Sequence, residues 1–66
     1  MKNNLRVERA RLRLTQQELA QQTGVTRQTI VAIEQGRFNP SVILALKMAR
    51  VFNTSVETLF ELETTD

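Results

Sequence analysis

The chain has 66 residues, of which nine are Lys or Arg, seven are Asp or Glu, and none is Cys or His. This length supports one small domain with a thin core, and the missing thiols and imidazoles exclude disulfides, thiolate metal sites and histidine-based catalysis. No apolar run approaches the ~20 residues of a membrane span, and the first residues lack the apolar segment of a signal peptide. We therefore expect a cytoplasmic single domain over residues 1–66 without cofactor or metal, with a core at about 5–60 and an acidic tail at 61–66.

Positive charge is concentrated in the first half of the chain. Residues 1–37 hold seven basic and three acidic residues, a net charge of +4, whereas residues 38–66 hold two basic and four acidic residues, a net charge of −2. A positive surface suits contact with nucleic-acid phosphates. A mixed charge pattern is also ordinary for any protein surface, so charge alone leaves both interpretations open.

Helical spacing of apolar residues dominates the chain, and strand signals are weak. The first helix is predicted to begin after Asn3 or Asn4, either of which can cap it, and to end near Leu12 or Arg13. Leu5 and Leu12 are two turns apart and are expected to face inward. Outward-pointing arginines that can supply diffuse positive charge are Arg6, Arg11 and Arg13.

A capping box marks the start of the second helix. Thr15 and Glu18 have the spacing at which each side chain accepts from a backbone amide of the other's turn. The helix is predicted over about residues 16–22, with Leu19 and Ala20 facing inward. Gly24 then supplies the positive φ that a tight corner between two helices requires.

The third helix is predicted over about residues 27–35, with Thr26 as its cap and Gly36 as the residue that ends it. Ile30 and Ile33 define its buried side, and at ~100° per residue Gln28 lies nearly opposite them. Glutamine pairs with adenine, arginine pairs with guanine, and small apolar side chains contact the thymine methyl group. The side chains predicted to read DNA bases are Arg27, Gln28, Val31 and Ala32.

Phosphate contacts are predicted at the ends of the second and third helices, where backbone amides favour anions. Gln16 begins the second helix, Thr26 and Thr29 offer hydroxyl groups, and Arg37 follows the third helix. The alternatives are that Gln16 is an ordinary solvated residue and that Thr26 acts only as a cap.

Arg9 and Glu34 flank the inward faces of their helices. We interpret them as a structural ion pair, with DNA contact by Arg9 as the alternative. Removal of one side chain of such a pair is expected to destabilise the fold, because the remaining charge is left uncompensated.

Two more helices are predicted in the second half of the chain. Ser41 caps a helix over about residues 42–52, and Ser55 caps a short helix after a left-handed residue at Asn53. No apolar patch is clearly left over for a dimer interface. The predicted core side chains are Leu44 or Ala45, Met48, Ala49, Phe52, Val56, Leu59 and Phe60.

The segments Thr15–Ala20, Gly24–Ile30, Ile33–Arg37 and Asn39–Ser41 together resemble the phage Cro/repressor-type, or XRE-family, helix-turn-helix. The resemblance covers about residues 5–60 and implies a compact all-α, five-helix lambda-repressor-like domain. It also implies a transcriptional regulator, with repression as the expected role, that binds a palindromic operator of double-stranded DNA as a homodimer.

Two positions depart from the pattern of this family. Arg13 stands where many members have a glycine, so it is expected to hold a strained conformation or to end the first helix differently. Ala32 is small where relatives often read a base with a longer side chain. Direct readout is therefore expected to rest mainly on Arg27 and Gln28.

A role in protein binding is the alternative function. The same fold serves as an antitoxin or as a subunit that binds another protein, with DNA binding secondary. The acidic tail Glu61–Asp66 and the ends of the last helix are where such a partner, or a second protomer, is expected to dock. An enzyme is not expected, because the acidic residues are scattered over helix surfaces.

Overall fold

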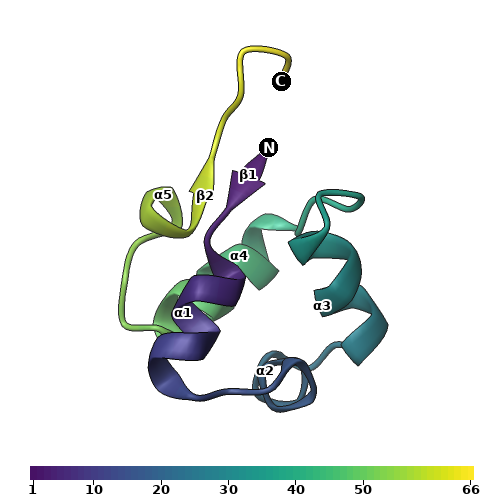
Figure 1. Ribbon diagram of the computed structural model, residues 1–66, viewed down its shortest axis with the longest axis vertical. Coiled ribbons are helices and arrows are strands. Elements are labelled where there is room, and N and C mark those ends of the chain that lie inside the picture. The colour runs from purple at the N-terminus through teal and green to yellow at the C-terminus, as the bar shows by residue number, and fades with distance from the viewer.

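The computed structural model describes residues 1–66 as five helices and one two-stranded sheet (Figure 1). The helices are α1 Leu5–Leu12, α2 Gln16–Thr23, α3 Arg27–Glu34, α4 Val42–Val51 and α5 Val56–Leu59. Antiparallel pairing joins the strands β1 Lys2–Asn3 and β2 Phe60–Glu61. Every predicted helix is present within one or two residues of its expected bounds, which confirms the five-helix fold class. None of the helices has the length and apolar character needed to cross a membrane.

One apolar cluster forms the core, and every helix contributes to it. Figure 1 shows α4 crossing behind α1, with α3 at the right of the view and α2 at the bottom. Ile30 and Ile33 are both buried, so the core determines how α3 is rotated about its axis. The largest fully buried side chains are Leu5, Leu19, Ile30, Ile33, Met48, Phe52 and Leu59.

Hydroxyl side chains cap four of the helices, as predicted. The Oγ atoms of Thr15, Thr26, Ser41 and Ser55 each accept a hydrogen bond from the backbone amide three residues later, at 3.0–3.2 Å. Glu18 completes the capping box, because its Oε1 accepts from the amide of Thr15 at 2.9 Å. These contacts satisfy amides that a helix leaves free at its start.

Left-handed residues end four helices. Gly24 has φ 76° and Gly36 has φ 75°, whereas Arg13 and Asn53 adopt φ 57° and 52° without being glycine. At the end of α1 the amide of Leu14 donates to the carbonyl of Arg9 at 2.8 Å, the hydrogen bond of a Schellman motif. The strained conformation expected at Arg13 is therefore present.

Two expectations about α1 need correction. Leu12 is 40% exposed, because the core packs against the first turn, where Leu5 is completely buried, and leaves the last turn open. Asn4 occupies the cap position without a side-chain cap bond, and its Nδ2 donates instead to the carbonyl of Thr58 at 3.0 Å. Asn3 supplies the side-chain acceptor at the start of α1, since its Oδ1 accepts a hydrogen bond from the amide of Leu5 at 3.3 Å.

The acidic tail at residues 61–66 is held against the first residues of the chain. Lys2 lies opposite Glu61 in the small sheet, and the amino group of Met1 lies 3.0 Å from a carboxylate oxygen of Glu63 and 3.1 Å from one of Asp66. The amide of Glu63 and this amino group lower the pKa of Asp66. Strands of two residues are too short to show alternation, so the sequence carries no signal for this sheet.

Candidate nucleic-acid interface

The outward face of α3 carries the side chains predicted to read bases. Arg27 and Gln28 are exposed, and Val31 and Ala32 are half-buried along the flanks of the same face. Because Ile33 and its neighbour one turn earlier are buried, the opposite side of the helix must point into solvent. The rotation of α3 therefore presents all four side chains outside the core.

A hollow of about 410 Å³ lies between this face and the loop that follows α3. It brings together five of the eight residues predicted to contact DNA, although they come from the cap, the helix and the loop. The residues that line it are Thr26, Gln28, Thr29, Ala32, Arg37 and Phe38.

Phe38 is the member of this hollow that the sequence reasoning missed. Phe38 is 51% exposed, beside Arg37, and it also lines a second hollow with Val25 and Leu44 at the edge of the apolar cluster. The sequence signal that indicates its exposure is its position in the loop Arg37–Pro40, where a buried aromatic ring is not expected.

The hydroxyl groups of Thr26 and Thr29 lie side by side at the start of α3. Their Oγ1 atoms are 3.0 Å apart, and Oγ1 of Thr26 also accepts from the amide of Thr29 at 3.2 Å. One of the two hydroxyl hydrogens is used between them, so the other is available to an outside acceptor. Thr26 can therefore cap the helix while the pair still offers a donor.

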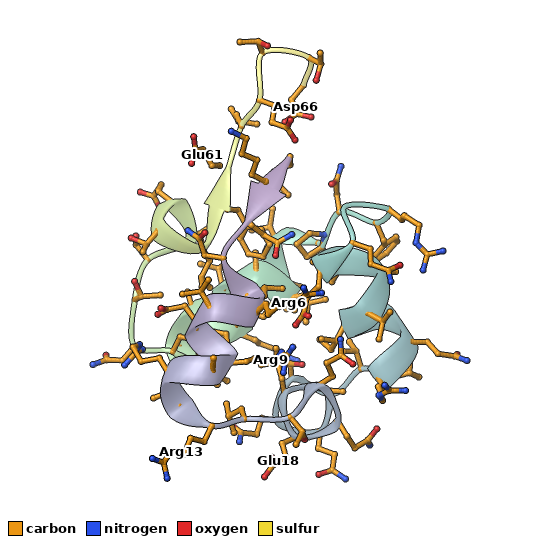
Figure 2. The ribbon with its side chains drawn as sticks, viewed as in Figure 1. Arg6, Arg9, Arg13, Glu18, Glu61 and Asp66 are labelled. Carbon is orange, nitrogen blue, oxygen red and sulfur yellow. The ribbon has the colours of Figure 1, made fainter.

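Arg9 and Glu34 make a two-point ion pair between α1 and α3. Nε of Arg9 donates to Oε2 of Glu34 at 2.6 Å, and Nη2 donates to Oε1 at 3.0 Å. The side chain of Glu34 is only 1% exposed, which makes this carboxylate the most enclosed charge of the interface. Figure 2 shows Arg6 and Arg9 on the side of α1 that faces α3, and Nε of Arg6 lies 4.0 Å from the same carboxylate.

Gln16 is tied to this ion pair rather than free in solvent. Its Nε2 donates to Oε1 of Glu34 at 3.2 Å, and its side chain is half-buried. One amide hydrogen of Gln16 remains for an outside acceptor. The interaction fixes the first turn of α2 relative to the last turn of α3, which are the two elements predicted to contact phosphates.

Several arginines at the surface have no acidic partner, and they include Arg27 and Arg37 at the two ends of α3. Arg13 is also unpaired and points away from the molecule (Figure 2). Arg11 differs, because its Nη2 lies 3.1 Å from Oε1 of Glu8 and donates to the carbonyl of Phe52 at 3.1 Å. It holds α1 against α4 and is not the diffuse charge expected from the sequence.

Comparison with known proteins identifies a matching family. The helix-turn-helix family model matches residues 5–59. The chain is 52% identical over 60 residues to an uncharacterised HTH-type transcriptional regulator of Archaeoglobus fulgidus, over 91% of this chain and 86% of that protein. It is 50% identical over 60 residues to a similarly described regulator of Methanocaldococcus jannaschii, over 91% of each chain.

Solved structures share the fold. The restriction-modification controller protein C.AhdI from Aeromonas hydrophila has a TM-score of 0.78 and 32% identity, over 86% of each chain. A chain of the SinR–SinI complex has a TM-score of 0.79 and 26% identity, over 94% of this chain and 66% of that one. The resemblance to the Cro/repressor-type proteins is thus confirmed, and the chain belongs to the helix-turn-helix family.

Proposed function

We propose that this DNA-binding transcriptional regulator recognises its operator by placing α3 in the major groove. The observation that carries the proposal is the hollow in which Gln28 and Ala32 lie beside Thr26, Thr29 and Arg37. Groups suited to base edges and groups suited to phosphates thus share one surface, as readout and positioning require.

Each side chain of this surface has a role in the proposal. Arg27 and Gln28 pair with base edges, and Val31 and Ala32 contact thymine methyl groups. Phosphates are bound by Gln16, Thr26, Thr29 and Arg37, with the free amides at the starts of α2 and α3. Arg9 and Glu34 hold Gln16 in place and do not read bases.

The functional unit in this proposal is a homodimer on a palindromic operator. One α3 helix reads only a few base pairs, so two copies related by a two-fold axis are needed for a unique site. Occupation of such a site near a promoter blocks transcription, which makes repression the proposed outcome. C.AhdI and the regulators of similar sequence support a role in control of transcription, since their names describe controllers and regulators.

Selection of bound sequences from a random duplex pool tests this function. The expected result is a palindromic motif with half-sites centred ~10 base pairs apart. If no motif is enriched, or if binding to all sequences weakens equally as the salt concentration rises, DNA readout is overturned and the role in protein binding is favoured.

Two substitutions separate base reading from phosphate binding. Gln28→Ala is expected to lower discrimination at one position of each half-site by about 1–3 kcal/mol, because the bidentate pair is lost. Arg37→Ala should weaken binding to all sequences equally and reduce the dependence on salt by about one phosphate per half-site. If Gln28→Ala selected the same motif as the parent with unchanged preference, the assignment of Gln28 to readout would be wrong.

A further inference from the structure

Arg6 is an exposed cation whose donors have no acceptor in the protein. Its side chain is 78% exposed, and its Nε lies 4.0 Å from Oε1 of Glu34, beyond hydrogen-bond distance. That oxygen already accepts from Nη2 of Arg9 at 3.0 Å and from Nε2 of Gln16 at 3.2 Å, which uses both of its lone pairs. The N–H donors of the Arg6 guanidinium therefore remain available to an acceptor outside the chain.

The charge of Arg6 is also left over. Glu34 is already paired at two points with Arg9, since Nε of Arg9 donates to Oε2 at 2.6 Å in addition to the bond at Oε1. One carboxylate thus faces two guanidinium groups, and the cluster of these three side chains keeps a net charge of +1. An anion that approaches Arg6 meets a positive site.

Two other acidic groups nearby do not neutralise this site. Glu8 stands on the same helix, but its Oε1 lies 3.1 Å from Nη2 of Arg11. Glu18 projects from α2 in the direction away from Arg6, as Figure 2 shows, and its carboxylate accepts from the amide of Thr15. The space in front of Arg6 therefore remains open to a negative group.

Arg6 lies on the flank of α3 opposite to the loop that follows this helix. Ala32 and Glu34 stand ~100° to either side of the buried Ile33. The flank with Ala32 borders the hollow that contains Arg37, whereas the flank with Glu34 adjoins Arg6 and the start of α2. Cations therefore border the outward face of α3 on both sides.

We propose that Arg6 binds a DNA phosphate on the backbone that lies across the major groove from the one bound by Arg37. A helix in the major groove lies between two sugar–phosphate backbones, so each flank of α3 faces one of them. The planar guanidinium group suits two oxygens of one phosphate. The inference rests on the proposed function, because it takes α3 to be in the groove.

The role assigned to Arg6 differs from the diffuse positive charge expected from the sequence. Diffuse charge acts at a distance, so an exposed arginine elsewhere on the same helix would contribute equally. A direct contact releases counterions from one phosphate and belongs to one side chain. The dependence of binding on salt separates the two roles.

Titration of a random DNA duplex at several salt concentrations tests the contact. Arg6→Ala is expected to reduce the slope of log K against log salt by about 0.9 for each copy bound, the loss of one phosphate contact. Arg6→Lys keeps the charge and should retain the parental slope. Arg13→Ala is the matched control, because Arg13 is an unpaired arginine at the end of the same helix that points away from the molecule (Figure 2). Equal slopes for Arg6→Ala and Arg13→Ala would overturn the proposal.

Neutral methylphosphonate groups, placed singly along each strand of the selected operator, locate the contact. One such group at the phosphate bound by Arg6 should weaken the parent, yet it should leave Arg6→Ala unaffected, because that variant has already lost the contact. Arg37→Ala should become insensitive at a phosphate on the other side of the groove. If Arg6→Ala keeps the parental sensitivity at every phosphate, or shares its insensitive phosphate with Arg37→Ala, the assignment is wrong.

These outcomes are separable from those of the proposed function. If the random pool yields no motif and Arg6→Ala still lowers the salt slope more than Arg13→Ala does, the phosphate contact is supported and base readout is overturned. If a palindromic motif is enriched and the two variants behave alike, base readout is supported and the contact of Arg6 is overturned.

Discussion

Arg13 occupies a backbone conformation that suits glycine. Its φ of 57° brings the Cβ atom close to the following carbonyl group. The Schellman motif at the end of α1 forces the conformation, because the amide of Leu14 must reach the carbonyl of Arg9. Arg13 therefore carries a small amount of backbone strain at the surface.

Arg13→Gly is expected to stabilise the protein by about 0.5–1 kcal/mol. Relief of the left-handed strain, ~1–2 kcal/mol, exceeds the extra chain entropy that glycine adds to the unfolded state. Thermal unfolding followed by circular dichroism measures the change. Arg13→Ala serves as the control, because it removes the charge and keeps the strain. Equal stability of the two variants would show that charge and not backbone strain governs this position.

The capping box at the start of α2 makes this element sensitive to acid. The amide and hydroxyl of Thr15 bind the carboxylate of Glu18 and hold its pKa below the ordinary value of 4.5. A carboxyl group whose pKa is lowered by folding stabilises the native state above its unfolded pKa. That contribution is present at neutral pH and is lost as the pH falls through the lowered, folded pKa.

Glu18→Gln is expected to flatten the decline of stability below pH 4.5. The glutamine oxygen can still accept from the amide of Thr15, so the cap persists while its proton linkage disappears. Unfolding midpoints of parent and variant, measured in steps of pH, provide the comparison. Glu57→Gln is the control, since Glu57 is exposed and accepts no hydrogen bond in the structure. Parallel pH profiles for parent and Glu18→Gln would contradict the linkage.

At the scale of the whole molecule, Glu34 joins three helices. It binds Arg9 of α1 at two points, and it accepts from Gln16 of α2 while it belongs itself to α3. Its side chain is almost completely enclosed. This carboxylate therefore adds a polar link between α2 and α3 to the apolar packing of the core.

Glu34→Ala is expected to lower the free energy of unfolding by about 3–5 kcal/mol, because it leaves the guanidinium of Arg9 without a charged partner. A domain of this size has a total stability of only a few kcal/mol, so the melting temperature should fall by ~12 °C or more. The double variant Arg9→Met with Glu34→Leu removes both charges and is expected to recover most of the loss. A double variant as unstable as Glu34→Ala would show that hydrogen bonding, and not the uncompensated charge, dominates.

The sequence by itself determined the helices and the rotation of α3. These signals act within one or two helical turns, so they can be recognised without knowledge of distant contacts. They are helix caps such as Thr26, left-handed residues at helix ends such as Gly24, and the spacing of Ile30 and Ile33. The family pattern and the set of side chains that face outward from α3 follow from the same local signals. The strain at Arg13 was also predictable, because a glycine is typical of that position.

Only the tertiary structure decided which distant groups meet. The attachment of Gln16 to Glu34 and the pairing of the two short strands join segments that are not neighbours in the chain. The exposure of Val42, Ile43 and Leu46 was not predictable for the same reason, since α4 is apolar on most of its sides and only the packing of the other elements leaves one side open. Burial is a property of the assembled core, whereas capping and turns are properties of a few consecutive residues.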